Sequence, residues 1–204
     1  MLTKNQLLEP LSRLRGDAAI VTTMGVVRPW GKYSSSELDF ASADSAMGHA
    51  ADLALGIALA QPERKVICLN GDGSMLMTLG TLVTITAARA QNLVLFVIQN
   101  GTYEITGNQP IPAWDKVDFS AFARGAGFTR IYRFDEPGDY ASSLPEVLSV
   151  EGPVFATVVI EPGSEGPISR SQREESYYLK LSLAEWGRIM QRALGTKADR
   201  ITES

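Results

Sequence analysis

Two short apolar runs constrain the fold of this chain more than any other feature of its sequence. Residues Val66–Leu69 (VICL) and Leu93–Ile98 (LVLFVI) are apolar at every position. A strand with one face in water alternates apolar and polar residues, whereas a strand buried on both faces does not. Strands of the second kind belong to parallel sheets whose crossover helices cover both faces. The chain is therefore predicted to be an α/β protein with a three-layer, doubly wound parallel sheet.

The rest of the pattern extends that sheet. Apolar runs predict strands at five places: Ala18–Thr23, Val66–Asn70, Leu93–Gln99, near Thr129–Tyr132, and Val154–Ile160. Helical patterns lie between them at Met75–Ala90, the expected crossover, and at Met47–Ala60. The second of these is rich in Ala and apolar on nearly every side, so we expect it in the core or under a subunit interface.

Both ends of the chain also carry helical signals. Leu7, Leu8, Leu11 and Leu14 stand at helical spacing, and Ser182-x-x-Glu185 is a capping box that opens a C-terminal helix. The Gly, Pro and Ser content of 162–173 indicates a segment that is mobile or wraps another chain. We therefore expect one domain over residues 1–161, followed over 162–204 by a linker and a C-terminal packing helix.

Composition excludes several classes of function. The 204 residues include 19 Lys+Arg against 23 Asp+Glu, a net charge of −4, which provides no basic field for a nucleic acid. No apolar stretch is long enough to span a membrane, and the N-terminus does not read as a secretory signal. The single cysteine, Cys68, cannot form an intrachain disulfide or assemble a zinc or iron–sulfur site. These features favour a cytoplasmic protein.

Polar residues follow two of the predicted strands at the point where each ends. Asn70-Gly71-Asp72-Gly73-Ser74 comes after VICL, and Gln99-Asn100-Gly101 comes after LVLFVI. The 25 residues from Ser74 to Ile98 are enough for a right-handed crossover, which returns Asn100 to the same sheet edge as Asp72. Glycines at a strand-to-helix turn allow a phosphate to approach the backbone, and a neighbouring carboxylate suits Mg²⁺. An ordinary Asp-Gly turn is the alternative.

Together with DSAMGHAADLALGIALAQPERK upstream, the GDGS and QNGT motifs resemble the diphosphate-binding domain of thiamine-diphosphate-dependent enzymes. The resemblance covers about 18–161. Within that family the sequence is most similar to sulfopyruvate and phosphonopyruvate decarboxylases. The similarity lies in Met47-Gly48-His49-Ala50 and in the loop 106–110. Gln99 departs from the paired Asn of the family, at the position that does not bind metal.

The resemblance implies roles for individual residues. Asp72, the Asn100 side chain and the Thr102 carbonyl would hold Mg²⁺. The cofactor would contact a further set of residues: Ser45, Met47, Gly48, Gly71, Gly73, Ser74, Asn100, Thr102 and Tyr103. Within it, a carbonyl near Ser45 would receive the aminopyrimidine, and Met47 would hold the cofactor in its bent form unless it is simply a core residue.

Two residues are candidates for catalysis by the same resemblance. Glu104 would lie in a loop over the thiazolium and relay a proton, with a solvated loop carboxylate as the alternative. His49, the only histidine, would face substrate or diphosphate, with a structural histidine as the alternative.

Members of the family also carry a pyrimidine-binding domain, for which this sequence has no room. The implied function is a Mg²⁺ and thiamine-diphosphate-binding subunit of a 2-oxoacid decarboxylase, completed by a pyrimidine-domain subunit in a hetero-oligomer such as α2β2. An acetolactate-synthase-like carboligase subunit and a non-catalytic cofactor-binding regulatory chain remain the alternatives.

Overall fold

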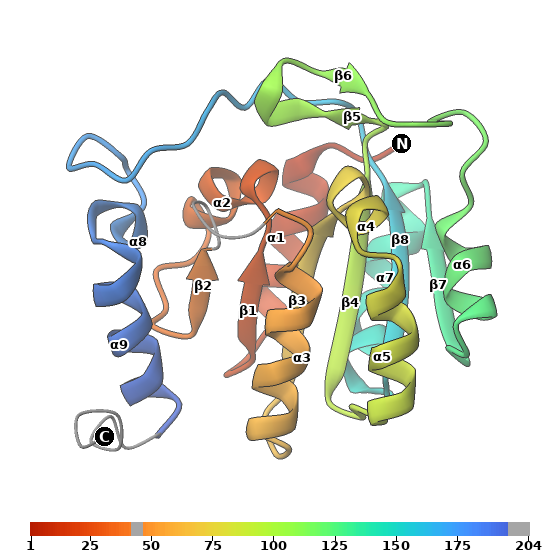
Figure 1. Cartoon of the computed structure of the whole chain (residues 1–204), viewed down its shortest axis with the longest axis horizontal. Helices are drawn as coiled ribbons and strands as arrows, with labels where there is room; N and C mark the ends of the chain where they lie inside the picture. Colours follow the sequence, from red (N-terminus) through yellow and green to blue (C-terminus); the bar gives the residue numbers. More distant parts are fainter. Residues whose placement is uncertain (42–46, 196–204) are drawn as a thin grey trace.

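Six parallel strands form the central sheet of the computed structural model, in the order β2-β1-β3-β4-β8-β7 (Figure 1). The structure describes residues 1–41 and 47–195. In sheet order the strands are β2 Asp39–Ala41, β1 Ala19–Thr22, β3 Val66–Gly71, β4 Leu93–Gln99, β8 Val154–Val159 and β7 Arg130–Phe134. A short antiparallel pair, β5 (Thr102–Tyr103) and β6 (Gln109–Pro110), lies above the carboxyl ends of the strands.

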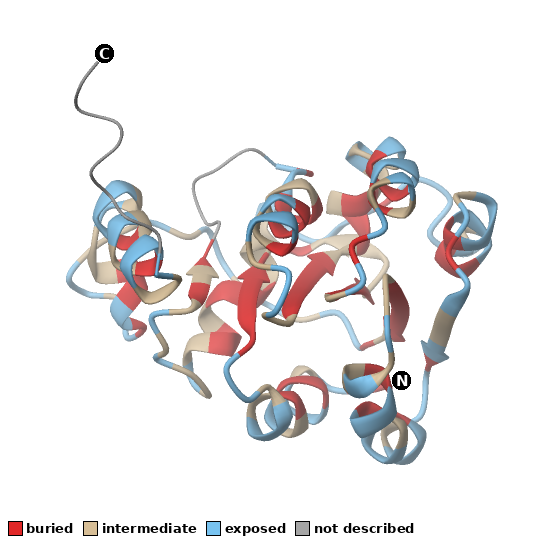
Figure 2. Cartoon of the chain, turned by 90° about the horizontal axis from the view of Figure 1, so that it is seen from below, coloured by how far each residue is buried: buried red, intermediate tan, exposed pale blue. Residues whose placement is uncertain are grey.

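Helices cover both faces of this sheet (Figures 1 and 2). On one face lie α3 (Ala50–Ala60), α5 (Gly80–Ala88) and α6 (Phe119–Gly125). On the other lie α1 (Lys4–Leu14), α2 (Met24–Gly31) and α7 (Pro137–Ser149). Strand β4 shows why its sequence does not alternate, because Leu95 faces the first core and Phe96 the second, both fully buried. The predicted three-layer α/β fold is confirmed.

The sheet reverses its direction of growth between β1 and β3. From β1 the chain passes through α2 to β2 at the outer edge, and then returns through α3 to β3 on the other side of β1. The two crossover helices therefore lie on opposite faces of the sheet. At such a switch point they diverge and leave a crevice at the carboxyl ends of the strands.

The predicted helices differ in detail from those observed. The pattern over Met75–Ala90 is divided into α4 (Asp72–Met77) and α5, because Thr78 leaves the helical conformation and its hydroxyl donates to the Gly48 carbonyl at 2.6 Å. The helix expected from Met47 begins only at Ala50, since Gly48 has a φ of +90°. It buries one face, whereas Leu59 on its outer face is 54% exposed.

The ends of the chain pack on the sheet mostly as expected. The capping box of Ser182 and Glu185 is present at the start of α9 (Leu183–Ala193). Leu7, Leu8 and Leu11 of α1 are buried, but Leu14 is exposed because the helix ends there.

The segment 162–173, which we expected to be mobile or to wrap another chain, is held against its own chain as part of a longer connecting segment, residues 161–176. Contact with another chain stays a prediction. The connecting segment crosses above α2, where the Arg28 guanidinium binds the carbonyls of Gly166 and Pro167 and the Glu174 carboxylate. In Figure 1 it runs from β8 across the top of the sheet to α8 (Tyr177–Lys180). The segment thus forms part of the wall above the carboxyl ends of the strands.

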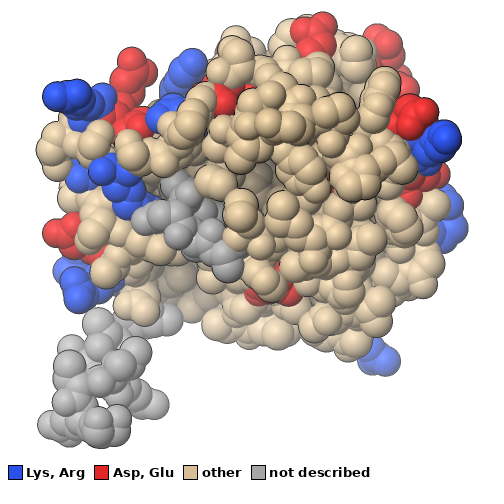
Figure 3. Space-filling model, turned by 45° about the horizontal axis from the view of Figure 1, so that its top comes forward, with Lys and Arg blue, Asp and Glu red and all other residues tan. Residues whose placement is uncertain are grey.

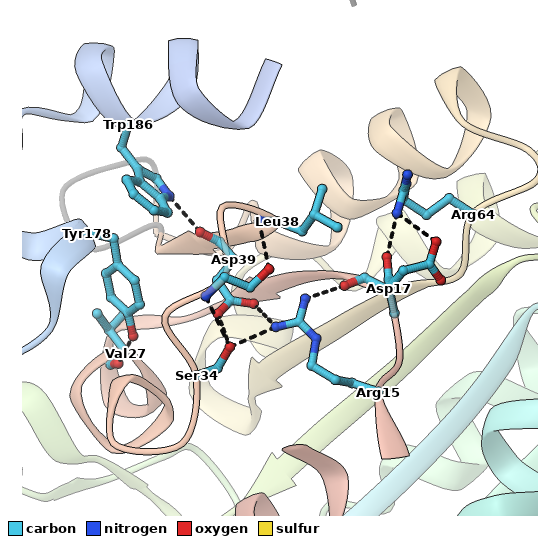
Figure 4. Close-up of polar contacts among 11 residues, drawn as sticks. Arg15, Asp17, Val27, Ser34, Leu38, Asp39, Arg64, Tyr178 and Trp186 are labelled. Atoms are coloured by element: carbon cyan, nitrogen blue, oxygen red, sulfur yellow. Dashed lines mark hydrogen bonds and ion pairs between the residues drawn. The ribbon is translucent and has the colours of Figure 1, made fainter. Parts of the chain in front are cut away.

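A buried polar cluster fastens the C-terminal helices to the edge strand β2 (Figure 4). The Asp39 carboxylate accepts hydrogen bonds from the Arg15 guanidinium and the Ser34 hydroxyl. The Trp186 indole N–H donates to the Asp39 carbonyl at 2.6 Å, and the Tyr178 hydroxyl donates to the Val27 carbonyl. Because these side chains are buried, the cluster fixes the edge of the sheet farthest from β7.

In the described ranges, no helix combines the length and the apolar character that a membrane crossing requires.

Candidate functional site

The crossover brings the ends of β3 and β4 side by side. Gly71 is paired with Ile98 in the sheet, so the residues that follow each strand start from neighbouring positions. Asp72 connects them: its Oδ1 accepts from the Gly73 N–H at 2.8 Å and its Oδ2 from the Gly101 N–H at 2.7 Å. The two polar motifs therefore form one structural unit at the carboxyl edge.

The Asp72 carboxyl group carries an electrostatic cost in this position. Its residue is only 2% exposed, and burial raises the pKa of the carboxyl to about 6, although backbone N–H groups of Gly101 and Gly73 act in the opposite direction. A cation beside this carboxylate would stabilise the charged form. The electrostatics of Asp72 thus fit a metal ligand.

The GDGS turn also leaves room and hydrogen-bonding capacity. The Ser74 hydroxyl is buried without a hydrogen-bond partner among the described residues, as is Oδ1 of Asn70. Buried polar atoms are rarely left unpaired, so a bound group is a natural partner for the Ser74 hydroxyl. Gly73 has to be glycine, since a Cβ there would lie 2.5 Å from the ring of Tyr103. The Tyr103 ring closes this side of the turn.

Asn100 and Thr102 present oxygen atoms beside Asp72. Asn100 Oδ1 accepts from the Thr102 N–H at 3.0 Å and keeps a second lone pair, while its Nδ2 donates to Glu104 Oε2 at 3.1 Å. The carbonyls of Gly101 and Tyr103 accept from Ile111 and Asn108 within the β5–β6 hairpin. Successive carbonyls of an extended strand point to opposite sides, so the Thr102 carbonyl points away from β6.

A cavity of about 130 Å³ opens at this edge, at the switch point between β1 and β3. It brings most of the predicted site residues together. Those among its lining are Met47, Gly48, Gly71, Asp72, Gly73, Ser74, Asn100, Thr102, Tyr103 and Glu104. In the oblique view of Figure 3, in which this edge comes forward, most charged side chains lie toward the periphery and uncharged surface lies between them.

The residues expected to hold the aminopyrimidine end are only partly described. Ser45 lies outside the described residues. Met47 lines the cavity and is 62% exposed, so in this chain it is not a core residue. Gly48 is confined by Met77, whose Cβ would lie 2.9 Å from a Cβ added at Gly48.

His49 is not among the residues that line the cavity. Its Nδ1 lies 2.7 Å from Asp52 Oδ2, and the other oxygen of Asp52 accepts from the Thr81 hydroxyl at 2.6 Å. The cavity lining includes its neighbours Gly48 and Ala50, whereas the His49 side chain is about half exposed beside it. The ring is held from one side, and a direct contact with a ligand in the cavity stays a prediction.

Glu104, which we expected in a loop over the thiazolium, lines the cavity, but it is buried and so is not the solvated loop carboxylate that we gave as the alternative. It begins a 3₁₀ turn, Glu104–Thr106, and its side chain is 3% exposed. Oε1 lies 2.5 Å from Lys4 Nζ and 2.9 Å from the Glu165 N–H, while Oε2 accepts from Asn100. The burial follows from the N-terminus and the connecting segment, which close over this turn.

Sequence reasoning missed two parts of the cavity wall. Lys4 precedes the leucines that predict the first helix and was assigned no role, and no local pattern relates it to a turn 100 residues later. The segment from Thr23 to Gly25 also lines the cavity. Since it directly follows β1, the rule that ligands bind at the carboxyl ends of strands could have located it.

Comparisons with known proteins agree with this geometry. The family described as "Thiamine pyrophosphate enzyme, C-terminal TPP binding domain" matches residues 21–158. The chain is 34% identical over 172 residues to the sulfopyruvate decarboxylase subunit beta of Methanothermobacter thermautotrophicus, covering 80% of this chain and 85% of that subunit. It is 35% identical over 166 residues to the phosphonopyruvate decarboxylase of Streptomyces viridochromogenes, but there it covers 78% of this chain and only 40% of the relative.

A solved structure shows the same fold. The Rhodococcus jostii thiamine diphosphate-dependent 4-hydroxybenzoylformate decarboxylase superposes with a TM-score of 0.64 at 21% identity, over 80% of this chain and 33% of that one. The family match covers β1 to β8 and includes both polar motifs. The chain therefore belongs to the thiamine pyrophosphate enzymes, as a C-terminal TPP-binding domain.

Proposed function

We propose that this chain is the Mg²⁺ and thiamine-diphosphate-binding subunit of a 2-oxoacid decarboxylase, with an active site completed by a pyrimidine-domain subunit. The observation that carries the proposal is the convergence of Asp72 and Asn100 on one cavity. Beside them lies the buried hydroxyl of Ser74, which has no hydrogen-bond partner in the described part of the chain. A carboxylate, an amide oxygen and a backbone carbonyl are the hard oxygen ligands that Mg²⁺ prefers, with a diphosphate completing its coordination.

The residues divide between the metal and the cofactor. Asp72, the Asn100 side chain and the Thr102 carbonyl would hold Mg²⁺. Gly73 and Ser74 would contact the diphosphate, with Gly48, Gly71 and Tyr103 as the surrounding walls. Met47 and the region of Ser45 would support the aminopyrimidine.

When bound, thiamine diphosphate supplies an electron sink for the loss of CO₂ from a 2-oxoacid. The contribution of this chain is to bind and orient it. The fixed glycine turn determines where the diphosphate can lie, and Asp72 provides the negative charge for the metal. The half-exposed ring of His49, held by Asp52, is available to face substrate at an assembled site.

A partner subunit accounts for several observations. The Methanothermobacter relative is named as a subunit beta, and this chain spans 85% of it. Met47 and Met77, which both line the cavity, are 62% and 48% exposed. A pyrimidine-domain subunit docked at this edge would cover such apolar surface. We assign residues 1–161 to the diphosphate domain and 162–204 to a linker and a C-terminal packing helix, of which α9 packs on β2, and we place the protein in the cytoplasm.

The test is turnover of a panel of 2-oxoacids by the purified chain alone and after addition of a pyrimidine-domain subunit, with saturating Mg²⁺ and thiamine diphosphate. We expect activity only in the assembled enzyme, with CO₂ and an aldehyde as products. An acetohydroxyacid product would instead identify a carboligase. Binding without turnover in the assembled enzyme would favour a regulatory chain. Turnover by the chain alone within tenfold of the assembled rate would contradict the shared active site.

A further inference from the structure

The turn that follows Asn100 is held by an ion pair between two distant parts of the chain. Glu104, in this turn, meets Lys4, the first residue of α1, at 2.5 Å, and both side chains line the same cavity as Asp72. We propose that Lys4 and Glu104 are positioning residues that fix the amide of Asn100 for metal binding. This inference rests on the proposed function, because it assumes that Asn100 binds Mg²⁺.

The hydrogen bonds of Glu104 define its role. All three groups that meet its carboxylate are donors: Lys4 Nζ and the Glu165 N–H at Oε1, and Asn100 Nδ2 at Oε2. A carboxylate only accepts hydrogen bonds, so it satisfies all three. The two donors at Oε1 occupy both of its lone pairs, so a proton on that oxygen would point at a donor. The arrangement therefore suits a fixed acceptor better than the proton relay that the sequence suggested for Glu104.

The position of Lys4 is hard to explain by helix stability. Lys4 is the first residue of α1, and the first turn of that helix contains no acidic residue. The N-terminus of a helix is the positive end of its dipole, which disfavours a cation. Lys4 Nζ instead reaches across to Glu104 and to the Gly25 carbonyl at 3.1 Å. The Lys4 ammonium group thus binds the turn at Glu104 and the cavity wall at Gly25, and it does not stabilise its own helix.

The connecting segment completes the enclosure. A Cβ at Gly163 would lie 2.3 Å from Glu104 Oε1 and 2.7 Å from Lys4 Nζ, so only glycine allows the backbone to pass this close. The segment also accepts from Asn108 Nδ2 through the Gly163 carbonyl at 3.0 Å. The ion pair is therefore largely buried, with side chains 16% and 3% exposed, and a buried charge pair is screened much less than one in water.

These contacts fix the orientation of the Asn100 side-chain amide. An amide group has two ends that can exchange places by rotation, and only the oxygen binds a metal. Because Nδ2 donates to Glu104 and Oδ1 accepts from the Thr102 N–H, both ends are assigned before any metal arrives. Partners that orient a metal ligand in this way typically change metal affinity by about 10- to 100-fold.

The experiment compares Glu104→Ala, Lys4→Met and Lys4→Arg with Asp17→Asn. The last removes the carboxylate of an exposed ion pair with Arg64, away from the cavity, and is the matched control. Two properties of the full chain are measured. One is the affinity for thiamine diphosphate in MgCl₂, by calorimetry, and the other is the NMR resonance of the Asn100 side-chain amide without any ligand.

We expect Glu104→Ala to weaken cofactor binding by about 10- to 100-fold and to shift the Asn100 amide resonance. Lys4→Met should weaken binding by a smaller factor, and its effect should disappear in the Glu104→Ala background. Lys4→Arg should restore most of the affinity, and Asp17→Asn should match the wild type in both measurements. Lys4→Met keeps the test valid if Glu104→Ala fails to fold.

Two results would overturn the inference: affinities of Glu104→Ala and Lys4→Met within twofold of the wild type, or an unchanged Asn100 amide resonance in both variants. A wild-type chain that binds no thiamine diphosphate in MgCl₂ contradicts the proposed function itself. In that case the amide resonance still decides whether Glu104 holds Asn100.

Discussion

The buried carboxyl of Asp72 predicts an unusual dependence of stability on pH. Burial raises its pKa from an ordinary value of 3.8 to about 6. Below pH 3.8 the group is protonated in both the folded and the unfolded chain, so it costs nothing. As the pH rises through 6, the folded chain has to bury a charge that the unfolded chain exposes to water. The free energy of unfolding therefore falls with rising pH through this group.

The size of the effect follows from the two pKa values. The gap between 3.8 and about 6 corresponds to about 3 kcal/mol of unfolding free energy, lost mainly between pH 4 and pH 7. Burial also raises the pKa of Asp39, so the wild-type curve alone is a mixture. The difference between the wild type and Asp72→Asn isolates the contribution of Asp72, because Asp39 is common to both.

The assay is urea unfolding of the metal-free and cofactor-free chain from pH 4 to pH 8. The free energy of unfolding of the wild type, minus that of Asp72→Asn, should fall by about 2.5 kcal/mol over this range, because part of the change lies below pH 4. Adding Mg²⁺ and thiamine diphosphate at pH 8 should stabilise the wild type and leave Asp72→Asn unchanged. A difference that is constant or rises with pH would refute the reasoning.

Three further predictions concern single side chains. Met47→Ala should change the free energy of unfolding by less than about 0.5 kcal/mol, since the side chain is exposed, yet lower the activity of the assembled enzyme; full activity would exclude a role in shaping the cofactor. Gly73→Ala should lower the free energy of unfolding by about 1–3 kcal/mol, because its Cβ would meet an aromatic ring of the β5–β6 hairpin. Gly138→Ala, where a Cβ has open space, should not lower it. Equal effects in thermal or urea unfolding would show that the turn can adapt. Arg15→Met should cost about 3–5 kcal/mol by leaving a buried carboxylate unpaired, against less than about 1 kcal/mol for Arg13→Met at an exposed pair; similar costs would mean that the buried pair contributes little.

The parts of the fold that could be predicted are those with a strong local pattern. Strand β4 was predicted with the bounds that the structure shows. Its side chains are buried on both faces of the sheet, so Leu93–Ile98 form one continuous apolar run. Strand β2 was missed since it has three residues, one of them the buried Asp39, whose partner Arg15 comes from another element. Helix α7 was missed because Pro137 and Pro145 interrupt a helical reading, although the first stands at the helix start, where proline is favoured.

The candidate site also has a part that the sequence predicts and a part that depends on remote residues. The approach of Asp72 to Gly101 and Asn100 follows from the length of one crossover, so spacing alone predicts it. The burial of Glu104 depends on Lys4 and the connecting segment, which are remote in the sequence and carry no recognisable motif. Sequence spacing predicts where the candidate metal site lies, whereas the packing around it decides what a neighbouring carboxylate can do.

The central claim is that Asp72 binds Mg²⁺ and thereby the diphosphate of the cofactor. The most direct measurement is calorimetric titration of the full chain with thiamine diphosphate, with and without MgCl₂, for the wild type, Asp72→Ala and the exposed-site control Asp135→Ala. We predict that binding by the wild type and the control depends on Mg²⁺, and that Asp72→Ala binds at least about 100-fold more weakly, about 2.7 kcal/mol. Unchanged affinity in Asp72→Ala, or binding that does not respond to Mg²⁺, would contradict the assignment.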